Sequence, residues 1–211
     1  MSDGGGRFIT LEGGEGAGKS TQLQRLKGWL EARGRKVVAT REPGGSPGAE
    51  MIRTLLVEGP AERWDGATEA LLHFAARHEH LRATVWPALE HGEWVLSDRF
   101  ADSTVAYQGY GHGLDGAILE QLYHIAVGDF RPDLTLILDL PIEQGLARAG
   151  RRRGTETRYE SLPREFHARV RQGFLDIAAR HPERCVVIDA TGEIDATAAA
   201  IARAVSERVG V

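Results

Sequence analysis

The sequence predicts a three-layer α/β/α domain on a sheet of five parallel strands, because three observations agree. Short, nearly continuous apolar runs alternate with longer segments that carry apolar residues at helical spacing. The first run leads directly into a glycine-rich loop and then into one of these helical segments. Polar residues follow the runs, at the strand ends where ligands bind in such folds. The length of 211 residues suits a single domain.

Each expected element has a local cause. The strands are runs rich in Val, Leu and Ile that suit burial on both faces of a sheet, at Phe8–Leu11, Lys36–Thr40, Trp94–Ser97, Leu134–Leu138 and Cys185–Asp189. Apolar residues three and four positions apart predict helices over Lys19–Arg33, Glu50–Glu58, Thr68–His91, Leu114–Val127, Ile142–Ala149, Arg164–Arg180 and Ala196–Val209. Strands that alternate with helices in this way form a parallel sheet.

Composition excludes several classes of protein. The net charge of −4 gives no overall attraction to nucleic acid or to acidic membranes, and no apolar run approaches membrane-spanning length. The one cysteine, Cys185, lies in an apolar run, which favours a buried thiol and excludes an internal disulfide. The eight histidines form no recognisable metal site. Ser2–Gly6 lacks the apolar stretch of a signal peptide, so we expect a cytoplasmic enzyme without nucleic-acid or membrane partners.

The glycine-rich loop carries the strongest functional signal. Gly13 to Ser20 fits the pattern of Gly, four residues, then Gly-Lys-Ser/Thr, which binds nucleoside triphosphates. Its glycines let backbone N–H groups surround phosphate oxygens, and the following helix adds the positive end of its dipole. Lys19 is expected to face solvent and to reach the outer phosphates, while the Ser20 hydroxyl ligates Mg²⁺. The expected ATP site is Gly13, Gly14, Glu15, Gly16, Ala17, Gly18, Lys19, Ser20 and Thr21.

Further polar residues follow the second and third expected strands. Asp98 ends the third strand, where a carboxylate is placed to hold Mg²⁺ through water, and Arg99 beside it suits a phosphate. The turn Arg41–Gly45 directs Arg41 and Glu42 toward the same crevice. Arg53 on the next helix suits either a second phosphate or an ordinary surface position.

Two later segments are open to two interpretations each. Thr104 and Gln108 lie four residues apart, so on a helix they share one face that either reads the edge of a base or belongs to a surface helix capped by Asp102 or Ser103. The basic run 150–158 is either a solvated face or a mobile lid, at about residues 150–160, that closes over phosphates.

At this point the chain resembles the thymidylate kinases, which transfer the γ-phosphate of ATP to dTMP. The resemblance covers nearly the whole chain and rests most selectively on Arg41-Glu42-Pro43-Gly44-Gly45 and Ala106-Tyr107-Gln108-Gly109. It also rests on Leu11–Thr21, Asp98-Arg99-Phe100 and Phe130-Arg131-Pro132-Asp133. It implies the P-loop nucleoside triphosphate hydrolase fold, ATP and dTMP as substrates, Mg²⁺, and a homodimer formed through long apolar helices such as Thr68–His91.

The resemblance also implies roles for individual residues. Catalysis falls to Lys19, Arg99 and the lid arginines Arg151, Arg152 and Arg153, because the phosphate loop itself carries Glu15 instead of an arginine. The metal pair is Ser20 and Asp98, and Asp189–Gly192 meets the adenine. The expected dTMP site is Glu12, Glu42, Arg53, His73, Phe74, Arg77, Arg99, Thr104 and Gln108, with Arg77 on the thymine ring.

Two positions depart from the family pattern. An aromatic residue that stacks on the base is usual four positions before the thymine-binding arginine, where this chain has His73 followed by Phe74. An imidazole stacks less well than a phenyl ring, so either residue is a candidate. The lid usually carries an Asp at the position of Thr157, which leaves Glu160 as its remaining carboxylate.

Two alternatives remain at this stage. One is a kinase for another nucleotide or nucleoside, such as dCMP, which a panel of acceptors would separate. The other is a nucleotide-dependent switch that binds a protein partner. A switch turns over without an acceptor, and the chain shows no guanine-reading Asn-Lys-x-Asp sequence.

Overall fold

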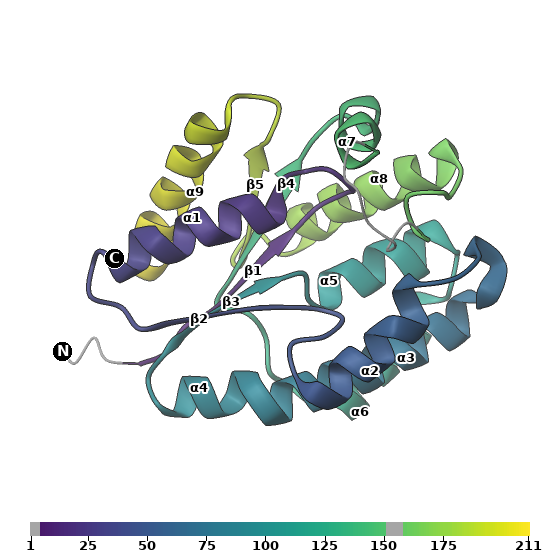
Figure 1. Cartoon of the computed structure of the whole chain (residues 1–211), viewed down its shortest axis with the longest axis horizontal. Helices are drawn as coiled ribbons and strands as arrows, with labels where there is room; N and C mark the ends of the chain where they lie inside the picture. Colours follow the sequence, from purple (N-terminus) through teal and green to yellow (C-terminus); the bar gives the residue numbers. More distant parts are fainter. Residues whose placement is uncertain (1–4, 151–157) are drawn as a thin grey trace.

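A computed structural model describes residues 5–150 and 158–211 and has the predicted three layers (Figure 1). Its five strands are all parallel and lie in the order β2-β3-β1-β4-β5. They are β1 (Phe8–Glu12), β2 (Val37–Arg41), β3 (Trp94–Asp98), β4 (Leu134–Asp139) and β5 (Cys185–Asp189). The predicted sheet is confirmed, with boundaries within one residue of those expected.

Helices connect the strands in the described ranges. They are α1 (Lys19–Glu31), α2 (Pro47–Val57), η1 (Ala61–Arg63), α3 (Gly66–His80), η2 (Leu81–Val85), α4 (Trp86–Glu90), α5 (Ala101–Thr104), η3 (Val105–Gly111), α6 (Gly116–Val127), α7 (Ile142–Ala149), α8 (Arg164–Arg180) and α9 (Ile194–Val209). Among the described residues, none of them is both long enough and apolar enough to cross a membrane.

Alternating strand residues build a core on each face of the sheet. Ile9, Leu96 and Leu136 join a buried cluster with Leu26 of α1 and Ile201 of α9. Their neighbours in sequence point to the other face, where two more clusters pack under α3, α4, α6 and α8. Both faces of the central strands are therefore covered, as parallel sheets require.

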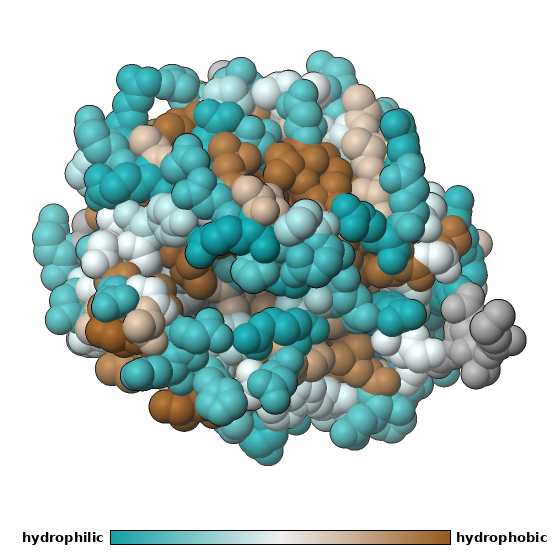
Figure 2. Space-filling view, turned by 180° about the vertical axis from the view of Figure 1, so that it is seen from behind, coloured by the Kyte–Doolittle hydropathy of each residue, from teal (hydrophilic) through white to brown (hydrophobic). Residues whose placement is uncertain are grey.

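The two edge strands depart from the expectation of burial on both faces. All five residues of β2 are partly or fully exposed, and Val187 of β5 is 44% exposed. Both strands lie at an edge of the sheet, so each has only one neighbouring strand and incomplete helical cover. On the side of the molecule shown in Figure 2, hydrophilic residues cover most of the surface, and apolar residues form separate patches between them. Cys185 is buried as predicted, and burial raises the pKa of its thiol to about 12.

The segment expected as one helix over Thr68–His91 consists of three helical pieces. Between α3 and α4, residues 81–85 form the π-helix η2, in which each backbone N–H bonds to a carbonyl five residues earlier. Pro87 in the first turn of α4 has no N–H to donate to the helix. The helix therefore widens by one residue directly before the proline and then continues.

The glycines of residues 13–18 permit a close approach between two backbones. Gly13, Gly16 and Gly18 have positive φ values of 135°, 68° and 88°. A Cβ atom on Gly16 would overlap the carbonyl oxygen of Gly145 in α7, whereas a Cβ on Gly14 would meet nothing within 4 Å. The loop thus needs glycine at residue 16 for both conformation and space.

Replacing Gly16 with Ala should destabilise the fold by on the order of 2 kcal/mol, because the new methyl group meets backbone at an unfavourable φ. Gly14→Ala is the matched control in the same loop and should change stability by less than about 0.5 kcal/mol. Urea unfolding of both variants measures the difference. Equal stabilities would show that the contact between the loop and α7 is not tight.

Candidate active site

The site lies where β1, β3 and β4 end side by side. Strand β1 ends at Glu12, and the glycine loop then leads into α1, whose first residue is Lys19. The Lys19 Nζ atom donates to the carbonyl oxygens of Gly13 and Gly14 at 3.1 and 2.9 Å. Lys19 is only 8% exposed, so the expectation that it faces solvent is wrong. Burial, and then the charge of Arg99, lower its pKa to about 8.

Ser20 and Asp98 meet although they are far apart in sequence. The Ser20 hydroxyl donates to Asp98 Oδ2 at 2.6 Å, because α1 starts beside the end of β3. The two side chains present hydroxyl and carboxylate oxygens, which are the ligand atoms that Mg²⁺ prefers.

Arg99 joins the glycine loop to α5 and η3. It has a positive φ of 74°, and its guanidinium donates to the Gly13 carbonyl, Ser103 Oγ, Glu15 Oε1 and Tyr107 Oη at 2.9 to 3.0 Å. Burial alone would raise the pKa of Glu15, but the charge of Arg99, followed by that of Lys19, lowers it to about 2. A fixed positive charge therefore lies between the loop and η3.

Glu12 is fully buried beneath this point. It accepts hydrogen bonds from the Phe100 N–H and the Ser103 hydroxyl, yet burial and then the charge of Asp102 raise its pKa to about 8. Asp102 itself accepts two bonds from Arg184, at 2.7 and 2.8 Å. Asp102 and Ser103 are thus occupied by Arg184 and Glu12, and the N-cap is Phe100. The alternative of a surface helix capped by Asp102 or Ser103 is wrong.

One face of α3 carries three polar residues at helical spacing, namely Glu69, His73 and Arg77. Arg77 is 2% exposed and donates to Glu42 Oε2 at 2.8 Å and to Thr104 Oγ1 at 3.1 Å. Glu42 also contacts His80 Nδ1 at 3.0 Å. Turn 41–45, α3 and α5 therefore meet around a single guanidinium group.

Gln108 of η3 faces the same side of α3. Its Nε2 atom donates to Glu69 Oε2 at 2.8 Å. Two buried atoms here, Gln108 Oε1 and Arg77 Nη1, have no hydrogen-bond partner in the described part of the chain. One is an acceptor and the other a donor. Because an unpaired buried polar group costs about 1–3 kcal/mol, these two atoms are candidates to bind a ligand.

Comparison with known proteins agrees with this geometry. The family model described as "Thymidylate kinase" matches residues 11–201. The chain belongs to the thymidylate kinase family. The thymidylate kinase of Caulobacter vibrioides is 54% identical over 206 residues, covering 98% of this chain and 99% of that protein. That of Magnetococcus marinus is 54% identical over 203 residues, covering 96% and 97%.

A solved structure, the thymidylate kinase from Ehrlichia chaffeensis, has a TM-score of 0.78 and 36% identity, and the match covers 95% of this chain and 99% of that one. The P-loop fold expected from the resemblance is thereby confirmed. Membership in the thymidylate kinase family makes the chain an ATP-dependent nucleoside monophosphate kinase that acts on dTMP. The alternative of a nucleotide-dependent switch is set aside on the same ground.

The two stacking candidates, His73 and Phe74, lie in different surroundings. Phe74 is 3% exposed and packs in the core, with its ring edge-to-face with Tyr123 at 6.3 Å. His73 is only partly buried, and its Nε2 atom lies 3.1 Å from the Tyr159 hydroxyl. Burial, and then the charge of Arg77, lower the pKa of His73 to about 3.

Other residues expected from the thymidylate kinase pattern lie at the edges of the site. Arg53 donates to the Pro43 carbonyl at 2.6 Å, which places it beside the turn that carries Glu42. Asp189 accepts two bonds from Thr191 in the loop after β5, and both residues are exposed. Arg151, Arg152, Arg153 and Thr157 lie outside the described residues. Glu160 follows in a turn and is half-buried.

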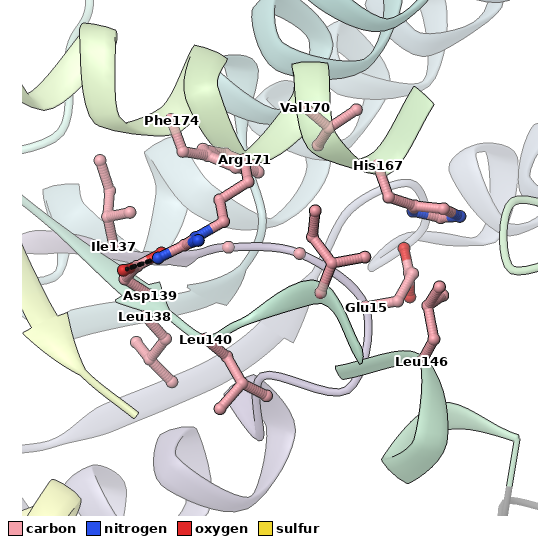
Figure 3. Close-up of a pocket in the computed structure, with 13 residues that line it drawn as sticks. Glu15, Ile137, Leu138, Asp139, Leu140, Leu146, His167, Val170, Arg171 and Phe174 are labelled. Atoms are coloured by element: carbon pink, nitrogen blue, oxygen red, sulfur yellow. Dashed lines mark hydrogen bonds and ion pairs between the residues drawn. The ribbon is translucent and has the colours of Figure 1, made fainter. Parts of the chain in front are cut away.

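A small cavity lies next to the glycine loop, between β4, α7 and α8 (Figure 3). Its volume of about 30 Å³ suits a water molecule and not a nucleotide. Figure 3 shows Glu15 and His167 along one side of it and the ion pair of Asp139 with Arg171, at 2.7 Å, along another. These contacts hold α8 against the end of β4.

Sequence reasoning missed the residues that support the site from behind. Glu69 is itself a buried carboxylate. Three further residues, which are buried or partly buried, each bind a buried carboxylate: His80, Arg158 and Arg184. Glu69 had a visible signal, since it lies two helical turns before Arg77 on the same face of an expected helix. Arg184 had none, because its partner Asp102 is 82 residues away.

Proposed function

We propose that this site transfers the γ-phosphate of Mg²⁺-bound ATP to dTMP, with thymine read by the side chains between α3 and η3. The observation that carries the proposal is the unpartnered pair of Arg77 Nη1 and Gln108 Oε1. Thymine offers an acceptor at O4 and a donor at N3–H on one edge. Arg77 would donate to O4, and Gln108 would accept from N3–H. Cytosine offers the reverse pattern, so it would leave both protein groups unpaired.

The phosphate of dTMP would lie among the cations at the strand ends. Arg99 and Arg53 would bind it, and Glu12 and Glu42 would lie near the sugar and the phosphate. Because a phosphate oxygen is already nucleophilic, the residues need mainly to align it and to neutralise charge that develops on the transferred group. Lys19 and Arg99, both within hydrogen-bond distance of the Gly13 carbonyl, are placed to do so.

Gly13 to Thr21 would bind the ATP phosphates through backbone N–H groups and the positive end of α1. The residues present fit Mg²⁺, since Ser20 Oγ and Asp98 Oδ2 are hard oxygen ligands that lie 2.6 Å apart. Ser20 and Asp98 would hold the ion, which would supply positive charge to offset the negative charge of the phosphates. Asp189 to Gly192 would meet the adenine.

We also propose a homodimer that forms through α3 and its neighbours. Four apolar side chains on α2, α3 and α6 are strongly exposed, namely Met51 (76%), Leu71 (56%), Ile118 (44%) and Ile125 (79%). These three helices pack side by side (Figure 1), so the side chains are placed to join one interface. Sedimentation equilibrium tests this, and a monomer at all concentrations would contradict it.

Because ATP is the donor, we place the enzyme in the cytoplasm.

The acceptor panel tests the proposed function directly. A coupled assay should detect ADP release only when an acceptor is present, with dTMP best and dUMP poorer. The value of kcat/KM for dCMP should be at least about 10²-fold below that for dTMP, because the mismatched edge leaves buried groups unpaired. Equal values for dCMP and dTMP would point to a different nucleotide kinase. ADP release without any acceptor would point to a switch.

The single domain is proposed to carry a lid at about residues 150–160 that supplies an arginine to the transition state. Changing Arg151, Arg152 and Arg153 together to Ala should lower kcat by about 10³-fold with little change in KM for dTMP, because Arg53 and Arg99 already hold the acceptor. The control changes Arg33, Arg203 and Arg208 to Ala, which are exposed and remove the same charge. An unchanged kcat with a raised KM would remove the lid arginines from catalysis.

His73 is proposed as the residue that stacks on thymine, and its lowered pKa gives a sharp test. An imidazole whose pKa is about 3 stays neutral throughout the range from about pH 5 to pH 8. The dTMP affinities of wild type and His73→Phe should therefore vary with pH in parallel, following only the second ionisation of the dTMP phosphate near about pH 6. A wild-type profile steeper than that of the variant would mean that His73 titrates.

Phe74→Ala is the companion variant. It should lower the free energy of unfolding by about 3–5 kcal/mol through loss of core packing, while the folded fraction still binds dTMP. Loss of dTMP binding in folded Phe74→Ala, with no effect of His73→Phe, would make Phe74 the stacking residue.

A further inference from the structure

We propose that Glu69 is a positioning residue that sets base specificity, because it fixes which end of the Gln108 amide faces the base. This inference rests on the proposed role of Gln108 in reading thymine. Glu69 lies outside the motifs that carry the family resemblance and precedes Arg77 by two helical turns of α3.

The two ends of a glutamine amide are nearly identical in shape but opposite in hydrogen bonding. The amide of Gln108 is fully buried, so packing alone does not distinguish its oxygen from its NH₂ group. An ionised carboxylate only accepts hydrogen bonds. With Glu69 Oε2 at 2.8 Å, the NH₂ group must face Glu69, which leaves Oε1 on the opposite side without a partner.

Several hydrogen-bond donors keep the Glu69 carboxylate ionised, so that it can only accept hydrogen bonds. Arg158 Nη2 donates to Oε1 in a buried ion pair, and the Tyr159 hydroxyl and His112 Nε2 lie 3.2 and 3.4 Å from Oε2. Burial alone would raise the pKa of Glu69, but hydrogen bonds from His112, Arg158 and Gln108 lower it to about 2. Glu69 is therefore ionised at neutral pH.

Arg158 is in turn held by backbone. Its other N–H groups donate to the carbonyl oxygens of Leu56 and Pro60, at 3.2 and 3.1 Å, where α2 ends. The carboxylate thus has a fixed orientation before any base arrives. Such preorganisation means that substrate binding does not have to turn the amide.

The orientation decides which base fits. With Oε1 toward the base, Gln108 accepts from N3–H of thymine. With the amide turned over, its NH₂ group would oppose that N3–H and would instead match the unprotonated N3 of cytosine. Glu69 would therefore lower the affinity for cytosine without contacting the base. Arg77 would add to this discrimination at the neighbouring ring position.

A double-mutant cycle tests this. The ratio of kcat/KM for dTMP to that for dCMP is measured in wild type, Glu69→Gln, Gln108→Leu and the double variant. Glu69→Gln presents an amide that both donates and accepts, so the ratio should fall by at least about 10-fold. In the Gln108→Leu background, the same change should leave the ratio within about 2-fold, because no amide remains to turn.

The outcomes separate the inference from the function on which it rests. Equal use of dTMP and dCMP by wild type would overturn the proposed function. A wild type that prefers dTMP, together with an unchanged ratio in Glu69→Gln or an equal fall in both backgrounds, would overturn only the role of Glu69. A purely structural role would lower both kcat/KM values together and leave the ratio unchanged.

Glu69→Gln removes the carboxylate partner of Arg158, which should lower stability. Glu69→Gln combined with Arg158→Met removes the buried guanidinium as well and should give the same fall in the ratio. A measurement on the unaltered enzyme is independent of folding in variants. The side-chain NH₂ resonance of Gln108, assigned by its loss in Gln108→Leu, should exchange slowly with water both with and without dTMP. Fast exchange in the complex would show that the NH₂ group does not remain on Glu69.

Discussion

Three buried glutamates hold the site together, and each one is satisfied by groups from other parts of the chain. Glu12, Glu42 and Glu69 are at most 4% exposed. Glu12 receives donors from the start of α5, Glu42 from two residues of α3, and Glu69 from η3 and from Arg158. A buried carboxylate without partners is very costly, so these elements must come together as a unit. The sheet brings the strand ends to one edge, but the carboxylates set the distances between the helices.

A buried carboxylate paired with a buried cation fixes the directions of hydrogen bonds, while its net contribution to the free energy of unfolding is small. Replacing a buried ion pair by apolar residues often leaves stability unchanged, whereas removing one partner is strongly destabilising. The pair of Arg77 with Glu42 fits this pattern, because it lies among Phe74 and Phe100, whose rings are 4.8 and 5.2 Å from the guanidinium carbon. An apolar side chain would fill that space as well, but it would not present a donor with a defined direction. The same reasoning applies to the buried ion pair of Glu69 with Arg158, which fixes the carboxylate that orients the Gln108 amide.

The sequence predicted the layers, the parallel sheet and the glycine loop because each depends on local signals, namely apolar periodicity and a fixed spacing of glycines. It predicted the residues at the strand ends for the same reason. It did not predict that Lys19 is buried, because burial depends on how the loop folds back over the side chain. It also did not give the pKa of His73, which depends on the charge of Arg77 one turn away and on burial. Partners such as Asp102 and Arg184 have no sequence signal at all, since only the folded chain brings them together.

Arg99 connects the half of the site that would hold ATP to the half that would hold dTMP. Its positive φ is unfavourable for a residue with a side chain, by on the order of 1 kcal/mol, and must be maintained by the surrounding contacts. That backbone conformation turns the guanidinium back over the glycine loop, where it binds the Gly13 carbonyl and Glu15, while Ser103 and Tyr107 bind it from the helical side. Its four partners lie in the glycine loop, α5 and η3 and leave it little freedom. A positive charge fixed at the boundary between two phosphate sites does not have to reorganise when charge moves from one phosphate to the other, and this is the condition under which electrostatic stabilisation of a transition state is most effective.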